Sequence, residues 1–217
     1  MKMLNAVGTV FLGVTLLVGH AFAASSNSIA PSSLVPVNAD SKIAKEYGKS
    51  LPPLAYVAFC ARTEGQSECN TRGSVERLIM TSDKMDQLNQ VNKYVNTKIK
   101  PMSDMDQYGV PDYWTYPVTA GDCEDYQLLK KCYLVQLGFA ADELLMTVVF
   151  DENGDGHAVL TVMAQDSDYI LDNRRNEILP WSQTGYKFLK RESQQNPRQW
   201  VSLRQSAPQI LVGSKTQ

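Results

Sequence analysis

The chain has 217 residues, of which 43% are hydrophobic and 20% are charged. This length suits one ordinary domain, or at most two small ones, and is ample to bury a core. The 21 basic and 23 acidic side chains nearly cancel, which argues against a dedicated nucleic-acid-binding protein, because such proteins carry a basic surplus. The four cysteines are too few for a disulfide scaffold, so their positions must decide whether they form disulfides, bind metal or react.

The first 23 residues have the three parts of a secretory signal peptide. Lys2 gives a positive start, residues 7–18 form an apolar run, and Ala-Phe-Ala at 21–23 is a small-x-small cleavage site. A membrane anchor is the alternative, but it needs about 20 apolar residues, and this run is shorter and interrupted by glycines. We therefore predict an exported protein with no membrane span after cleavage, in a compartment where disulfides persist.

The rest of the chain is expected to divide into a leader, a domain and a tail. Residues 24–44 are rich in Ser, Pro and Ala without a period, which predicts a flexible leader. The domain is expected at 45–205 and a disordered tail at 206–217.

Two of the cysteines, Cys60 and Cys69, lie close together in the sequence near the start of this domain. We expect them to close a short loop as a disulfide, worth about 2–3 kcal/mol in the loop-entropy model. A metal-binding pair is the alternative, disfavoured because no histidine lies nearby.

Two helices are predicted in the first half of the domain. Between 81 and 99, apolar residues recur at three- and four-residue intervals, which is helical spacing, and Thr81 or Ser82 can cap the start. A second helix is expected from about 122 to Gly138, since acidic residues in its first turn suit its dipole and a glycine suits its end. The segment 101–121 between them is predicted as a loop, whose aromatic residues either cover the core or wall a cleft.

Three strand-like runs follow, at 144–150, 157–163 and 169–173, separated by polar turns. They predict an antiparallel sheet, and with the helices they predict an α+β protein. The turn at 151–156 also matches the opening of a Ca²⁺-binding loop, but its twelfth position is Val162 instead of glutamate, so a hairpin turn is preferred. No element is assigned after the third run.

One cysteine and one histidine are candidates for a nucleophile and its base. Cys123 lies at the predicted start of the second helix, where free N–H groups and the helix dipole favour a thiolate. Cys132 lies too far along the same helix to pair with it and is expected to be a buried core thiol; the alternative is that Cys123 is one too. His157 is the only histidine after the predicted signal peptide, and Asp172, at the end of the next strand, can fix its tautomer.

Contact between His157 and Asp172 sets a condition on the hairpin that joins their strands. Antiparallel partners have a constant index sum, and 157 plus 172 is 329, which centres the turn between residues 164 and 165. A turn centred two residues later would leave the two side chains roughly 13 Å apart along the strand. A His–Asp pair therefore predicts the first register or a bulge. The competing acids, Asp166 and Asp168, are expected to be solvated in the turn.

Three acidic residues adjoin the candidate nucleophile, namely Asp122, Glu124 and Asp125. Carboxylates this close oppose ionisation of the thiol unless a bound cation, hydrogen bonds or an outward orientation compensates. The alternative is that they are only first-turn acids, which the helix dipole favours.

Four motifs in the chain match a known family in order and spacing. They are Trp114-x-x-Pro117, Gly121-Asp122-Cys123-Glu124-Asp125-Tyr126, Gly156-His157-Ala158-Val159-Leu160 and Leu171-Asp172-Asn173. Over about residues 50–204 the chain resembles the bacterial transglutaminase-like cysteine proteinase family, which includes the LapG-type periplasmic proteases. The Cys60/Cys69 pair and the leader differ from the LapG-type pattern, which suggests a separate branch.

This resemblance implies a papain/transglutaminase-like fold, with the nucleophile at a helix start packed on an antiparallel sheet. It implies that Cys123 is the nucleophile, His157 the general base and acid, and Asp172 the orienting acid. LapG-type members bind Ca²⁺ near the catalytic cysteine, so Asp122 and Glu124 become candidate Ca²⁺ ligands, although the triad itself requires no cofactor. The resemblance also implies a periplasmic location and a protein or peptide substrate. In the LapG-type subgroup this substrate is a surface adhesin cut at an Ala-Ala site, under control of an inner-membrane receptor.

The expected reaction begins with attack of Cys123 on a peptide carbonyl. Its own backbone N–H and a second donor from the loop around Trp114 and Tyr116 are the candidates for the oxyanion hole. Hydrolysis of the acyl-enzyme would make an endopeptidase acting on envelope or surface proteins, whereas release by an amine would make a transglutaminase or amidase. A third hypothesis is a non-catalytic Ca²⁺-dependent binding module of the same fold, which would have no unusually reactive thiol.

Overall fold

The computed structural model describes residues 42–62, 69 and 76–205. The predicted signal peptide, the leader up to residue 41 and the predicted tail lie outside these residues. The last residues assigned to the leader contact the domain: the carbonyl of Lys42 accepts a hydrogen bond from Asp168 N (2.9 Å), and Ala44 N donates to the Asp168 carboxylate (3.0 Å). No helix within the described ranges is long and apolar enough to cross a membrane.

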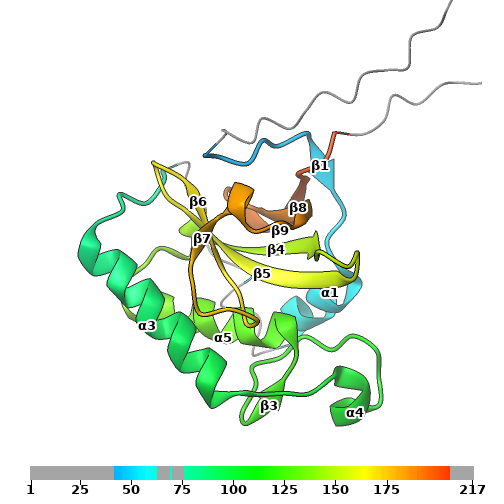
Figure 1. The fold of residues 1–217 in the computed structure, drawn as a ribbon. Helices are drawn as coiled ribbons and strands as arrows, with labels where there is room; N and C mark the ends of the chain where they lie inside the picture. Colours follow the sequence, from blue (N-terminus) through cyan, green and yellow to red (C-terminus); the bar gives the residue numbers. More distant parts are fainter. Residues whose placement is uncertain (1–41, 63–68, 70–75, 206–217) are drawn as a thin grey trace, which may run out of the picture. The chain divides into compact units, whose positions relative to one another are not determined.

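Seven strands form one antiparallel sheet in the order β1-β9-β8-β4-β5-β6-β7 (Figure 1). The strands are β1 (Lys49–Ser50), β4 (Leu144–Phe150), β5 (Gly156–Met163), β6 (Asp168–Leu171), β7 (Leu179–Pro180), β8 (Lys187–Ser193) and β9 (Asn196–Ser202). The three predicted runs, now β4, β5 and β6, are confirmed, and so is the mixed class of helices and antiparallel sheet.

The β8–β9 hairpin is not predicted by the sequence, and the reason lies in what β8 buries. Two of its buried side chains are charged, Arg191 and Glu192. Arg191 lies 2.9 Å from the Asp168 carboxylate, and Glu192 lies 2.9 Å from Lys131 Nζ. A pattern based on apolar alternation misses a strand whose inward positions hold paired charges. The ion pair between Arg191 and Asp168 also corrects the expectation that Asp168 is solvated in the turn, because the Asp168 side chain is buried.

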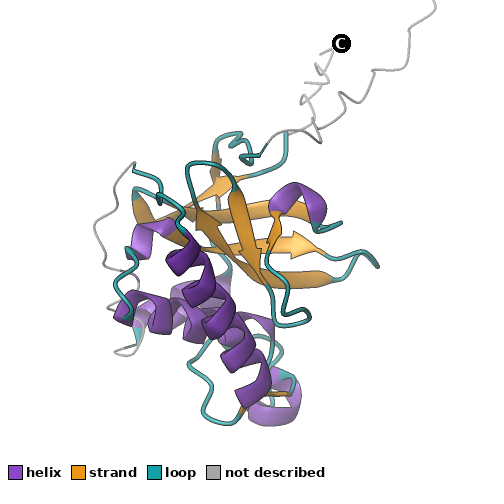
Figure 2. Cartoon of the chain, turned by 60° about the vertical axis from the view of Figure 1, so that its left-hand side comes forward, coloured by secondary structure: helices purple, strands orange, loops and turns teal. Residues whose placement is uncertain are grey.

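Two long helices lie side by side on one face of the sheet (Figure 2). They are α3 (Ser82–Lys98) and α5 (Cys123–Gln136). The remaining elements are short: α1 (Leu54–Ala61), α4 (Asp104–Tyr108), the parallel pair β2 (Lys100–Pro101) and β3 (Ala120–Gly121), and the 3₁₀ turns η2 (Ala141–Glu143) and η3 (Trp181–Gln183).

The core between α5 and the sheet fixes the helix that carries Cys123. Leu128 and Leu134 of α5 are at most 1% exposed, as are Leu160 and Val162 of β5. Each such side chain contributes about 1.5–3 kcal/mol on burial. The contact therefore holds α5 at a defined position over β5, the strand that carries His157.

The predicted ends of the two long helices are close to the observed ones. Thr81 caps α3, because its Oγ1 accepts a hydrogen bond from Lys84 N (3.3 Å), and Gly138 follows α5 with φ 93°. The segment 101–121 was expected to contain no helix, and this is wrong, since it includes α4. That helix starts after Ser103, whose Oγ accepts from the backbone N–H of Asp106 (3.2 Å), and ends at Gly109, which has φ 71°.

The register of the β5–β6 hairpin differs from both registers that the sequence suggested. Leu160 pairs with Leu171, an index sum of 331. By this sum Asp172, just after β6, falls opposite Val159, two residues from His157 and on the same side of the strand. Diagonal neighbours of this kind are still within reach of long side chains. A His–Asp contact therefore needs neither the predicted register nor a bulge.

Cys60 and Cys69 are joined in a disulfide with a Cα–Cα distance of 5.6 Å. Both residues are buried in the core, which confirms the predicted pairing. Cys132 is not the buried thiol that the sequence predicts: it is only half-buried, and Gln136 Nε2 lies 3.3 Å from its sulfur.

The β4–β5 connection is a hairpin turn built by Asp151. One of its carboxylate oxygens accepts hydrogen bonds from the backbone N–H groups of Asn153 and Asp155, both at 2.9 Å, and the other pairs with Arg174 at 2.5 Å. These contacts support the hairpin interpretation over the Ca²⁺-loop alternative.

Candidate active site

Cys123 is the first residue of α5, as the sequence predicts. The chain can enter the helix at this angle because residue 121 is glycine: a Cβ on Gly121 would lie 2.9 Å from the Cβ of Asp125. The Cys123 side chain is half-buried, and the backbone of Ala158 in β5 is near enough to lower the pKa of its thiol. The thiol therefore faces the beginning of the strand that carries the candidate base.

His157 and Asp172 form a buried pair. The ring Nε2 of His157 lies 2.9 Å from Asp172 Oδ1, and both side chains are at most 1% exposed. The other ring nitrogen, Nδ1, is buried and has no hydrogen-bond partner among the described residues. Since Nε2 is already bound to Asp172, Nδ1 is the ring nitrogen left to accept or release a proton.

Asp172 receives several hydrogen bonds. Besides His157, the backbone N–H of Arg174 donates to Oδ1 (3.0 Å) and the hydroxyl of Tyr186 donates to Oδ2 (2.5 Å). Burial by itself would raise the pKa of Asp172, but these donors outweigh it and lower the pKa to about 2. An ionised carboxylate only accepts, so His157 Nε2 must carry the proton.

Helix α3 anchors the segment that carries Asp172. Asn96 Nδ2 donates to the carbonyl of Asp172 (2.9 Å), and Asn92 Nδ2 donates to the carbonyls of Arg175 (3.2 Å) and Asn176 (3.1 Å). Sequence reasoning misses both asparagines. The sequence feature that could identify them is a pair of asparagines four residues apart, beside the apolar stripe of the helix.

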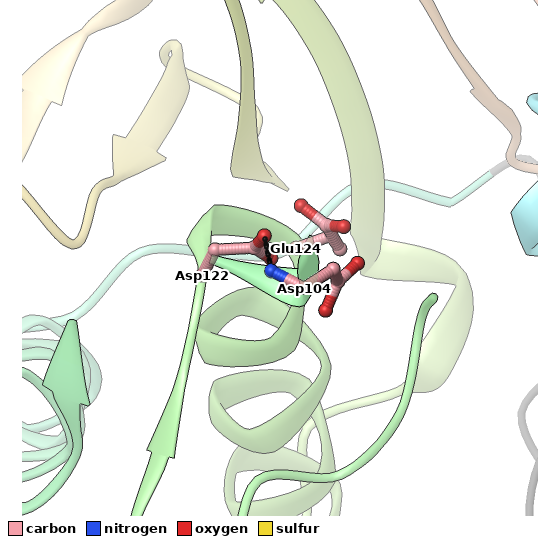
Figure 3. A group of neighbouring side chains, drawn as sticks. All are labelled: Asp104, Asp122 and Glu124. Atoms are coloured by element: carbon pink, nitrogen blue, oxygen red, sulfur yellow. Dashed lines mark hydrogen bonds between the residues drawn. The ribbon is translucent and has the colours of Figure 1, made fainter. Parts of the chain in front are cut away.

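Three carboxylates gather at the N-terminal end of α5 (Figure 3). One oxygen from each of Asp104, Asp122 and Glu124 lies within 4.8 Å of the other two. Asp104 N donates to Asp122 Oδ2 at 3.2 Å, the dashed line of Figure 3. Asp104 Oδ1 and Asp122 Oδ1 are buried without a hydrogen-bond partner in the described part of the chain. The sequence identifies Asp122 and Glu124, and it misses Asp104 because α4 is not predicted.

Glu124 of this cluster and the neighbouring Asp125 resist ionisation. Burial, followed by the charge of Asp122, raises the pKa of Glu124 to about 9. Burial also raises the pKa of Asp125 to about 8, although Thr115 N donates to its carboxylate (2.9 Å). Buried oxygens that lack donors and repel one another suit a hard cation with oxygen ligands, such as Ca²⁺.

The same environment corrects the expectation of an acidic thiol at Cys123. Burial raises the pKa of Cys123 well above its ordinary value, and the neighbouring Glu124, whose Oε2 lies 3.1 Å from the sulfur, raises it further. The backbone of Ala158 opposes this shift without reversing it. Glu124 is only 7% exposed, so an outward orientation of its carboxylate does not relieve the repulsion.

The aromatic loop lies mostly inside the protein. Trp114 is 3% exposed, meets the Tyr56 ring edge-on, and donates from Nε1 to Asp112 (2.9 Å). Tyr116 is half-buried, with its ring 5.7 Å from that of Phe59. Trp114 is therefore a core residue and not a cleft wall. The Trp114 carbonyl accepts a hydrogen bond from Arg62. The backbone N–H of Thr115, the next residue in the loop, donates to the Asp125 carboxylate.

A family model of the bacterial transglutaminase-like cysteine proteinases matches residues 46–208, a range that contains all four sequence motifs. No curated protein matches the chain.

Several solved structures are similar to the chain. Calcium-bound LapG of Legionella pneumophila is 25% identical, with a TM-score of 0.48, over 59% of this chain and 75% of that chain. EGTA-treated LapG of the same organism is 22% identical, with a TM-score of 0.44, over 66% and 82%. A further LapG structure is 21% identical, with a TM-score of 0.43, over 66% and 84%.

Proposed function

The chain belongs to the bacterial transglutaminase-like cysteine proteinase family and is thus a cysteine peptidase, and we propose that Cys123, His157 and Asp172 form its catalytic triad. The observation that carries the proposal is the buried contact of His157 Nε2 with Asp172 (2.9 Å). It leaves Nδ1 of the same ring without a partner among the described residues, and the next residue in the strand, Ala158, lowers the pKa of the Cys123 thiol through its backbone.

The proposed reaction starts with proton transfer from Cys123 to His157 Nδ1. The thiolate then attacks the peptide carbonyl, and the Cys123 backbone N–H at the helix start stabilises the developing oxyanion. His157 returns the proton to the leaving amine as the C–N bond breaks. A water molecule, deprotonated by His157, hydrolyses the thioester and releases the acid. Throughout the cycle Asp172 holds the Nε2–H tautomer and the imidazolium.

We propose that Asp104, Asp122 and Glu124 are ligands of a Ca²⁺ ion. The support is the orphaned buried oxygens of Asp104 and Asp122 and the raised pKa of Glu124, about 9. A bound Ca²⁺ would supply positive charge beside the thiol, which favours the thiolate. Without that charge, Glu124 and Asp122 disfavour ionisation of Cys123.

We also propose a periplasmic location and a protein substrate. The N-terminal sequence has the pattern of a signal peptide, and the disulfide between Cys60 and Cys69 suits an oxidising compartment. The proposed substrate is an exposed segment of an envelope or surface protein. By family resemblance, a surface adhesin under control of an inner-membrane receptor is the first to test.

Iodoacetamide labelling of the non-reduced protein tests the triad. Cys132→Ala removes the other half-buried cysteine that is not in a disulfide and serves as the background. In Ca²⁺ we expect Cys123 to be alkylated well below the ordinary thiol pKa of about 8.5, and His157→Ala should abolish this low-pH reactivity. An inert Cys123 in both Ca²⁺ and EGTA would contradict the enzymatic proposal and favour a binding module.

A second assay separates the outcomes of the acyl-enzyme. A quenched-fluorescence peptide with an Ala-Ala bond reports hydrolysis, and a fluorescent amine offered with a glutamine-containing protein reports acyl transfer. We expect hydrolysis. Incorporation of the amine at a higher rate would overturn the peptidase step while leaving the triad in place.

A further inference from the structure

Tyr186 contacts both residues of the proposed His–Asp pair. Its hydroxyl lies 2.5 Å from Asp172 Oδ2, the oxygen that His157 does not use. Its ring meets the His157 ring edge-on, with centroids 5.6 Å apart and an interplanar angle of 80°. Tyr186 is 9% exposed, so both contacts lie away from bulk water.

Arg175 determines which way the Tyr186 hydroxyl points. Its Nη2 donates to the hydroxyl oxygen (3.0 Å), and its guanidinium lies over the Tyr186 ring, 5.1 Å from the centroid. An arginine has only donors, so the single hydroxyl proton cannot point to Arg175. It is directed to the Asp172 carboxylate, which can only accept.

The backbone before β8 holds Tyr186 in this position. Thr184 Oγ1 accepts from the backbone N–H of Tyr186 (3.2 Å) and donates to the carbonyl of Trp181 (2.9 Å). Between them Gly185 has φ 81°, a conformation that glycine adopts without strain. The tyrosine is thus supplied by a turn that is separate from the strands carrying His157 and Asp172.

We propose that Tyr186 is a positioning residue of the triad, which fixes the rotation of the Asp172 carboxylate by binding Oδ2 and restricts the His157 ring through its edge. This inference rests on the proposed triad. With both oxygens bound by different donors, the carboxylate cannot turn about its last bond without losing a hydrogen bond. His157 then keeps Nε2–H toward Asp172 and Nδ1 toward the cysteine.

The test compares Tyr186→Phe with Tyr169→Phe in the full chain. Both variants keep the ring and remove a hydroxyl that binds an aspartate, because Tyr169 OH donates to Asp166 (2.6 Å), away from the triad. The deciding measurement is the solvent exchange of the His157 Nε2–H proton by NMR, with its signal assigned by its loss in His157→Asn. Thermal unfolding of each variant reports any change in stability alone.

In Tyr186→Phe we expect the Nε2–H proton to exchange at least about tenfold faster, and kcat for the Ala-Ala peptide to fall about tenfold with KM unchanged. Tyr169→Phe should match the unmodified protein. Unchanged exchange in Tyr186→Phe would overturn the proposal, even if the melting temperature falls, because a structural role alone lowers stability without freeing the proton. If the unmodified protein does not cleave the peptide, the proposed function fails, and the exchange measurement still decides the role of Tyr186.

Discussion

The sulfur of Cys123 lies 3.1 Å from Oε2 of Glu124, the next residue in the chain. Glu124 is buried and its pKa is raised to about 9, and the pKa of Cys123 is raised too, so without a cation both groups stay protonated at neutral pH. For Cys123 to ionise and act as a nucleophile, a positive charge from outside this pair must offset burial and the effect of Glu124. Asp104 and Asp122 complete a cluster that can hold the compensating cation.

Calcium is expected to raise thermal stability more at pH 8 than at pH 5. The pKa of Glu124 is raised above its ordinary value of 4.5 to about 9, so the folded cluster binds protons more tightly than the unfolded chain does. Without a cation, stability therefore falls as the pH rises through this window. Ca²⁺ removes this cost where its ligands are ionised. Melting temperatures in Ca²⁺ and in EGTA at both pH values check the prediction.

Asp104→Asn tests the calcium prediction, because it alters a proposed Ca²⁺ ligand. Its control is Asp106→Asn, since Asp106 is an exposed acid of the same short helix. We expect the calcium-dependent rise in melting temperature to be lost in Asp104→Asn and kept in Asp106→Asn. An equal shift in both variants would place the cation elsewhere.

Asp172→Asn should lower peptide cleavage by about 10²–10⁴-fold, because an amide no longer selects the Nε2–H tautomer of His157. It should also remove an acid-sensitive stabilisation. The pKa of Asp172 is lowered from 3.8 to about 2, so its stabilising effect of roughly 2 kcal/mol is complete above pH 4 and is lost as the pH falls toward 2.

Urea denaturation at pH 6 and at pH 2 measures this contribution. The gap between the unmodified protein and Asp172→Asn should be larger at pH 6. Asp166→Asn, which alters an exposed acid of the β5–β6 turn, should show no such change. A gap that does not depend on pH would mean that Asp172 is not ionised in the folded protein.

Local sequence patterns predict the parts of the fold and of the site that depend on nearby residues. Apolar periodicity identifies α3, acidic residues at the start and a glycine at the end identify α5, and strand-like runs between polar turns identify β4 to β6. The position of Cys123 at a helix start follows from the acids and glycine around it. The roles proposed for His157 and Asp172 rest on their positions in neighbouring strands, and these roles remain predictions.

The contacts that the sequence does not predict are polar and distant in the chain. Asp104 joins Asp122 from 18 positions away, Tyr186 reaches Asp172 from 14 positions away, and Asn96 holds the same segment from α3. Each depends on how helices and turns pack, which a single sequence does not state. The raised pKa of the thiol has the same origin, because it comes from burial and from the neighbouring Glu124.

Lys130→Met should stabilise the protein at neutral pH. Lys130 lies on α5 with 0% exposure, and its Nζ has no hydrogen-bond partner among the described residues. Burial lowers its pKa from 10.5 to about 7, although the charge of Asp172 opposes this. Methionine fills similar space without a charge, so we expect a gain of about 1–4 kcal/mol at pH 7.

The pH dependence distinguishes this effect from better packing. Between pH 7 and 10.5 the unfolded chain holds the Lys130 proton more tightly than the folded protein, so the stability of the unmodified protein should rise with pH in this window. The advantage of Lys130→Met should therefore shrink toward pH 10. Urea denaturation at pH 7, 8.5 and 10 measures it, and a constant advantage would contradict a buried, titrating lysine.

Lys131→Met, one residue further along α5, should have the opposite effect. Lys131 Nζ lies 2.9 Å from Glu192 Oε2, and both side chains are at most 2% exposed. Glu192 also accepts hydrogen bonds from Tyr56 OH and Met146 N, so removing the lysine leaves a buried carboxylate with its charge unpaired. We expect a loss of about 3–5 kcal/mol by urea denaturation at pH 7. Adding Glu192→Gln to Lys131→Met should recover part of this loss, because the unpaired charge is then gone, and no recovery would show that the lysine acts through packing.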